Sequence, residues 1–168
     1  MACGDTITAD TTLDSDLIDC PNNGIVIGAD DITLDLDGHT VEGNNELLDP
    51  CHKDQFCDTG ILNHGHSGVT IGDGAVTHFG TGTFILGVSH NRVHALEASH
   101  NTFNGVLIVE SRRSALTGSS TSFNGLETDF PGIAVFGSRH IQIRRTTSTR
   151  NADLGVVRPR VGPEPLRQ

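Results

Sequence analysis

The sequence predicts an all-β protein, a parallel β-helix built as a three-faced solenoid of about six coils with an amino-terminal cap. The first observation is a short apolar strand that recurs at residues 60, 83, 105, 132 and 155, with a sixth copy beginning at Gly24. The second is that turn residues, including many of the 20 glycines, separate these strands. A repeat of about 22 residues with one short strand in each unit is typical of stacked-coil solenoids.

The amino-terminal segment 1–23 lies outside this repeat. We expect it to cap the first coil, whose open strand edge would otherwise invite pairing with another chain. The first coil begins at Gly24, and apolar residues alternate with polar ones over 32–37, which is the period of a half-buried strand. Because a turn and a further short strand follow, each coil is predicted to contain three strands.

Two insertions interrupt the period, at 44–59 and at 126–131. Both precede one of the recurring strands, so both are expected at the same edge of the solenoid. Insertions that collect on one face often mark the binding face. The β-helix is thus predicted over 24–157. The proline-rich segment 158–168 follows as an irregular tail, which is either disordered or the point where a longer solenoid has been cut.

The four cysteines fall in two close pairs, Cys3 with Cys20 and Cys51 with Cys57. This spacing favours two local disulfides and therefore an oxidising compartment. The alternative is four reduced cysteines in a cytosolic protein. We expect a secreted or cell-surface protein, although no signal peptide opens this chain.

The formal net charge of −10 argues against nucleic acid and anionic membranes as partners. No apolar segment approaches the roughly 18 residues of a membrane span. A local basic patch would be needed to bind an anionic substrate.

Stacking the coils places residues about one repeat apart in columns. Counted from the strand starts, Phe84 belongs to an inward column and Ile85 to an outward one. The outward column is apolar throughout, and such a row marks an interface or an apolar ligand. A second copy of the chain is therefore one expected partner. The outward column consists of Val26, Leu62, Ile85, Leu107 and Ala134.

Three segments, 3–8, 24–28 and 32–41, together resemble the opening of secreted bacterial right-handed parallel β-helix proteins of the pectate-lyase-like superfamily. The resemblance covers about residues 3–157. It implies a right-handed coil and carbohydrate bound on the face of the recurring strand. Enzymes of the superfamily place paired carboxylates or an Asp/Arg set there. The outward column of this chain has no carboxylate, which argues against a pectate-lyase or polygalacturonase mechanism. If the protein is an enzyme, a hydrolase of carbohydrate or of a carboxylic ester is expected rather than a lyase.

The turn after the recurring strand carries the polar candidates. Ser67 and His90 are predicted to be neighbours on adjacent coils, with Glu110 one coil further. A serine activated by a histidine that a carboxylate orients is the arrangement of acyl transfer. The alternative is that all three are ordinary turn residues. The substrate-binding candidates are Leu62, His64, His66, Ile85, Leu107, Arg112 and Arg139.

Two charged groups remain. The later coils gather Arg112, Arg113, Arg139, Arg144 and Arg145, which either clamp a carboxylate or phosphate or balance the acidic first half. The densest acidic group either holds Ca²⁺ or forms a solvated face, and no other cofactor or metal is expected. It consists of Asp30, Asp31, Asp35 and Asp37 with His39.

Three functions follow from these observations. The first is binding or processing of carbohydrate, which rests on the resemblance. The second is hydrolysis of a small ester through Ser67 and His90. The third is a non-catalytic module that self-associates through its outward apolar column.

Overall fold

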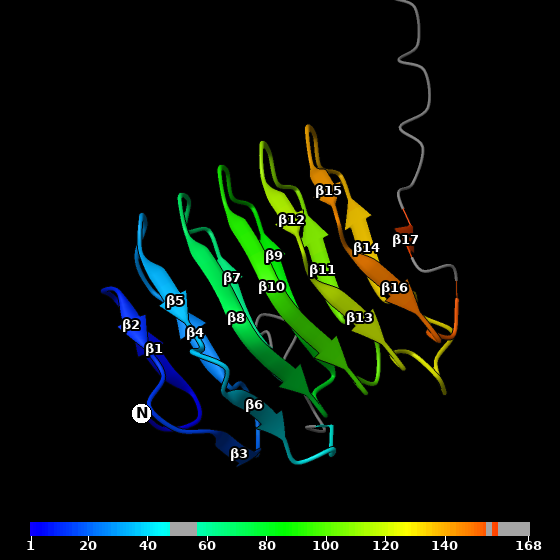
Figure 1. Ribbon diagram of the computed structural model, residues 1–168, viewed down its shortest axis with the longest axis horizontal. Coiled ribbons are helices and arrows are strands. Elements are labelled where there is room, and N and C mark those ends of the chain that lie inside the picture. The colour runs from blue at the N-terminus through cyan, green and yellow to red at the C-terminus, as the bar shows by residue number, and fades with distance from the viewer. Residues whose placement is uncertain (48–56, 154–155, 158–168) are drawn as a thin grey trace, which may run out of the picture.

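The computed structural model describes residues 1–47, 57–153 and 156–157. This part of the chain contains no helix and forms a parallel β-solenoid of about six turns. In Figure 1 the turns succeed one another from left to right along the horizontal axis. The predicted architecture of stacked parallel turns is therefore confirmed.

Each turn contributes one strand to a seven-stranded sheet in which every pair is parallel. The sheet follows the order of the chain, so each strand lies beside its equivalents in the preceding and following turns. Its strands are β1 (Asp5–Ile7), β4 (Ile25–Ile27), β7 (Thr59–His64), β9 (Thr81–Leu86), β11 (Val106–Val109), β14 (Ile133–Phe136) and β17 (Val156–Val157).

A ten-stranded parallel sheet, drawn in front in Figure 1, forms the rest of the wall and has two rows. The first row contains β2 (Thr11–Thr12), β5 (Thr33–Asp35), β8 (Thr70–Thr77), β10 (Arg92–Ser99), β12 (Ala115–Thr117) and β15 (Gln142–Arg144). The second row adds β3 (Leu17–Cys20), β6 (Thr40–Gly43), β13 (Ser120–Ser122) and β16 (Thr147–Thr149). The long strands β8 and β10 run through both rows. They change direction at Asp73 and Ala95, where φ is 60° and 44°.

The segment 1–23 is itself a turn of the solenoid. Its strands β1, β2 and β3 pair in parallel with β4, β5 and β6 of the next turn. Sequence reasoning placed this segment outside the repeat because only Ile7, Leu13 and Leu17 mark the three strands. All three side chains are buried, and each occupies a core position.

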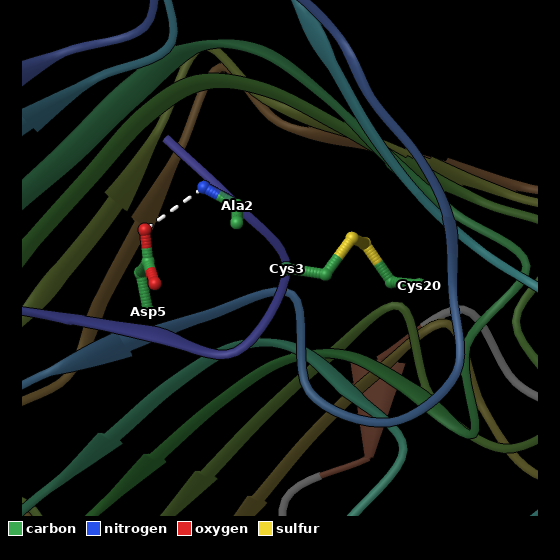
Figure 2. The surroundings of a disulfide bond; sticks show 4 residues. All are labelled: Ala2, Cys3, Asp5 and Cys20. Carbon is green, nitrogen blue, oxygen red and sulfur yellow. Dashed lines mark hydrogen bonds between the residues drawn. A yellow bond between two sulfur atoms is a disulfide. The ribbon is translucent and has the colours of Figure 1, made fainter.

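A disulfide joins the two ends of this first turn. Cys3 and Cys20 are bonded with their Cα atoms 5.4 Å apart, as predicted. Figure 2 shows the bond beside the hydrogen bond from the Ala2 backbone N–H to the Asp5 carboxylate, whose length is 2.8 Å. Cys57 is also disulfide-bonded. Its predicted partner, Cys51, lies outside the described residues.

The glycine that precedes most copies of the recurring strand is explained by close approach of neighbouring turns. A Cβ atom on Gly60 would lie 2.6 Å from the carbonyl oxygen of Gly82, and one on Gly82 would lie 2.5 Å from that of Gly105. No side chain fits at this corner. The copy of the recurring strand that was predicted to begin at residue 83 therefore begins at Gly82.

This one-residue shift corrects two predicted orientations. Thr83 pairs with Ile61 and Val106 and is buried, so it takes the core position that was predicted for Phe84. Ile85 is 1% exposed and lies in the core instead of in the outward column. A register error of one residue moves every side chain of a strand to the opposite face.

Candidate functional site

The structure does not join Ser67 to His90 by a hydrogen bond within the described residues. The Ser67 hydroxyl oxygen instead accepts hydrogen bonds from the Ser89 backbone N–H and hydroxyl, at 3.0 and 3.2 Å. The corrected register places His90 beside Gly68, one position beyond Ser67. Glu110 is exposed on the following turn. Within the described residues no hydrogen bond joins any two of the three predicted acyl-transfer residues, and their role stays a prediction.

His66 and its neighbours stabilise the turn that follows β7. The His66 ring Nδ1 lies 3.1 Å from the Asp30 carboxylate, which also accepts the Ser67 backbone N–H at 3.1 Å. Asn63, an amide in a column of apolar residues, is fully buried and bonds both the N–H and the carbonyl of His66. These contacts fix the turn.

The remaining candidates are divided between the seven-stranded sheet and the turns that follow its strands. Leu62 is only 7% exposed although it belongs to the outward column, and Leu107 is half-buried. His64 is exposed at the end of β7. Arg112 and Arg139 are exposed and pair with each other on successive turns.

The acidic group of the second turn is spread along the turn. Asp35 accepts the backbone N–H of Asp37 at 2.9 Å, and Asp30 is engaged with His66 as above. Across residues 1–47, 57–153 and 156–157, no three His, Cys, Asp or Glu side chains come close enough to hold a metal ion.

A buried amide ladder runs along the corner where the second row ends. The Asn101 side-chain N–H group donates to the Asn124 carbonyl oxygen at 2.9 Å, and Asn124 donates in the same way to Asn151 at 2.9 Å. Each accepting oxygen also takes the backbone N–H of the preceding asparagine. Asn124 is 0% exposed, so the ladder is internal. It fixes the backbone of this corner over three turns.

The residues before the three ladder asparagines, together with His78 of the preceding turn, form a column of three rings and one guanidinium. His78, His100, Phe123 and Arg150 all have φ between 55° and 61°, the left-handed conformation. The His100 and Phe123 rings are stacked with centroids 5.0 Å apart and an interplanar angle of 12°. The His78 ring lies 5.7 Å from that of His100, and the Arg150 guanidinium lies 5.4 Å from the Phe123 centroid. We call these four residues the ring column.

Both insertions contribute to a groove beside the ring column. Leu47 lies at the start of the first insertion, and Leu126, which is 58% exposed, lies in the second. The Thr128 hydroxyl donates to the Thr102 carbonyl at 2.5 Å and anchors the second insertion. The groove has a volume of about 460 Å³. It is lined by Asn45, Leu47, His78, His100, Asn101, Thr102, Phe123, Leu126 and Glu127.

Sequence reasoning predicted a common edge for the insertions but missed the ring column. A signal is present in the sequence, because a ring or arginine followed by asparagine recurs as His100-Asn101, Phe123-Asn124 and Arg150-Asn151. The spacing of the three asparagines is 23 and then 27 residues, and the insertion at 126–131 accounts for the longer second interval.

A second groove, of about 780 Å³, crosses β10, β12 and β15 on the first row of the ten-stranded sheet. Its charged and titratable lining residues are Arg92, Arg113 and three histidines, without a carboxylate among the lining residues. The histidines are His90, His94 and His140. His94 Nδ1 lies 3.5 Å from the Asp73 carboxylate of the preceding turn. This is the local basic patch that the acidic composition requires for contact with an anion.

No protein-family model, curated protein or solved structure matches the chain. The part of the chain that the structure describes has no helix long and apolar enough to cross a membrane.

Proposed function

We propose that this protein binds a neutral carbohydrate in the groove between its two insertions. The observation that carries the proposal is that both insertions deliver side chains to one groove, whose wall is formed by His78, His100 and Phe123 of the ring column. Rings present apolar surface to the C–H groups of a sugar, and a small number of polar groups fix its orientation. The groove supplies both kinds of contact.

The polar lining of the groove fits hydroxyl groups. Asn45 offers an amide, Thr102 a hydroxyl and Glu127 a carboxylate, while Leu47 and Leu126 add apolar surface at the rim. Among the lining residues that the structure describes there is neither lysine nor arginine, and Glu127 would repel an anionic sugar. A neutral saccharide therefore fits the groove better than a uronic acid.

The site is held by the interior of the solenoid. Each ring of the fourth and fifth turns directly precedes an asparagine of the buried ladder, so the ladder determines where the rings project. A binding surface built on a rigid scaffold loses little conformational entropy on binding. The Cys3–Cys20 disulfide and the resemblance to pectate-lyase-like proteins support a protein that acts in an oxidising compartment outside the cytoplasm.

The ester-hydrolase alternative has less support. The Ser67 hydroxyl is bonded to Ser89, and no base lies in hydrogen-bond contact with it among the described residues. The self-association alternative relied on an outward apolar column. Ile85, one of its members, is buried in the core and is not available for contact with a second copy.

The test is a binding screen with soluble neutral oligosaccharides of glucose, xylose, mannose and galactose, followed by calorimetry on the sugars that bind. We expect His100→Ala and Phe123→Ala each to weaken binding about tenfold, because each removes one ring of the wall. His90→Ala is the matched control, since His90 is also an exposed histidine with positive φ, at the other end of β10. Its affinity should stay within about twofold of wild type. Failure to bind any of these sugars, or an equal loss in His90→Ala, would overturn the proposal.

A further inference from the structure

Charge is segregated along the axis of the solenoid. In the described residues before Arg92 there is no lysine or arginine, whereas aspartates occur throughout the first three turns. The arginines of the described residues all lie in turns four to six, which contain β9 to β16. The protein therefore has an acidic end and a basic end.

The same gradient appears within single columns on the first row of the ten-stranded sheet. One column runs from Asp35 through Gly72, His94 and Thr117 to Arg144. A neighbouring column runs from Asp31 past Gly68 to His90, Arg113 and His140. In each column the second turn holds a carboxylate and the sixth holds a cationic or titratable base.

A groove of about 390 Å³ lies between the two charged halves. Small residues line part of it, with Gly74 of β8, Ala95 of β10 and Gly118 after β12. These residues leave room for side chains of a second body. The basic half is hollowed into the groove of about 780 Å³, and carboxylates are absent from its lining.

We propose that two copies of this chain pair through the outer face of this first row, with their solenoid axes antiparallel. A two-fold axis between β8 and β10, lying in the interface plane, places turn one opposite turn six and turn two opposite turn five. Asp31 then faces Arg113 of the second copy, and Thr12, two residues before Asp14, faces Arg144. Because a two-fold contact is isologous, each such pair forms twice.

A second copy of the chain complements the charges on this face better than another ligand would. A ligand of a single sign would be attracted by one half of the face and repelled by the other. A copy in the antiparallel orientation meets opposite charge over the whole length. End-to-end stacking would use the same charges but would join only the terminal turns of each copy, and it would continue beyond two copies.

The association is driven by exposed charges and is therefore screened by salt. Raising NaCl from about 20 mM to about 500 mM shortens the Debye length from roughly 20 Å to roughly 4 Å. Sedimentation equilibrium of the wild-type chain should show dimers at low salt and a dissociation constant at least about tenfold higher at high salt. A monomer at both salt concentrations, or dimers insensitive to salt, would overturn the proposal. So would masses that grow beyond two copies, because they would indicate end-to-end stacking.

Charge reversal tests the orientation. Arg113→Glu/Arg144→Glu and Asp14→Arg/Asp31→Arg should each be monomeric at low salt, and a one-to-one mixture of the two variants should recover a dimer. If the mixture stays monomeric while both variants keep the wild-type far-ultraviolet circular dichroism, the proposed facing pairs are wrong. Should either variant fold poorly, Arg113→Gln/Arg144→Gln replaces the basic reversal, and the expected result is a weaker dimer with a smaller salt dependence.

Discussion

The first three turns and the last three turns are joined to their neighbours by different side chains. In the first three, the amides of Asn22 and Asn23 accept hydrogen bonds from the next turn at one corner, and elsewhere carboxylates of one turn accept hydrogen bonds from the next. The pairs are Asp10 with the Thr33 N–H, Asp16 with the Thr40 N–H and His39, Asp30 with the Ser67 N–H and His66, and Glu42 with His78. In the last three turns the accepting side chains are neutral, and they accept backbone N–H groups of the preceding turn. They are Ser114, Ser119, Ser138 and the ladder of Asn101, Asn124 and Asn151.

The difference follows from burial. Asn124 and Ser114 are buried, where a neutral amide or hydroxyl can be satisfied completely and a carboxylate would lose its hydration. Asp16 and Asp30 are exposed, so they remain hydrated while they cap the next turn. One backbone geometry is thus stabilised by two sets of side chains. The ring column is anchored mainly on the neutral, buried set, which suits a binding site that must keep its shape.

The largest effect is expected from breaking the buried ladder. The Asn124 side chain makes four hydrogen bonds, to Asn101, Asn151 and the Ala98 carbonyl. Asn124→Ala leaves several buried groups unpaired and should lower the free energy of unfolding by about 4 kcal/mol in urea denaturation. Gln142→Ala, which removes an exposed amide, is the control and should change it by less than about 0.5 kcal/mol. Similar small changes in both variants would show that the ladder adds little.

The disulfide of the first turn should have the next largest effect. Cys3→Ser/Cys20→Ser opens a loop with a sequence separation of 17 and should lower the free energy of unfolding by about 3 kcal/mol. Hydrogen exchange should accelerate most in β1 to β3, because the bond joins the ends of that turn. Uniform acceleration over all six turns would instead mean that the solenoid unfolds as one unit.

A smaller change of opposite sign is expected at the boundary between the halves. The Thr83 hydroxyl is buried and makes no hydrogen bond within the described residues. Thr83→Val keeps the shape of the side chain and should raise the free energy of unfolding by about 1 kcal/mol in urea denaturation. Destabilisation by this change would indicate that the hydroxyl has a partner in solution.

The smallest effect on stability is expected when low pH protonates Asp16 in the first turn. The Thr40 backbone N–H and the His39 ring lower the pKa of Asp16 below its ordinary value. The stabilisation from Asp16 is therefore complete above the pKa of an unfolded aspartate, about 3.9, and is lost as the pH falls through the lower folded value. Urea midpoints measured from about pH 7 to about pH 2 should fall less steeply in Asp16→Asn than in wild type. If the urea midpoints of Asp16→Asn and wild type fall equally with pH, Asp16 does not contribute to the pH dependence of stability.

The comparison of the two halves also shows how far the sequence predicts the structure. The repeated apolar strand predicted stacked parallel turns, and the close cysteines predicted the Cys3–Cys20 bond. The register failed at one point, because Gly80, Gly82 and Thr83 offer several starting positions within four residues. That error placed Ile85 on the surface and Ser67 beside His90. The first turn was missed because its strands are short and polar, with isolated apolar positions.

The candidate groove was predicted only as an edge where two insertions emerge. The ring column depends on left-handed corners at His100 and Phe123, which sequence patterns indicate only where glycine occupies them. The asparagine ladder is visible only when equivalent residues of successive turns are aligned. Both features are products of turn-to-turn register and become evident in three dimensions.

The most direct test of the central claim is an NMR titration of the isotopically labelled protein with a neutral oligosaccharide selected by the binding screen. We expect the largest amide shifts at His100, Thr102 and Phe123 and in the second insertion. The amides of Arg92 and Thr117, in the basic groove, should hardly move. Shifts centred on that basic groove, or on the outer face of the seven-stranded sheet, would contradict the central claim.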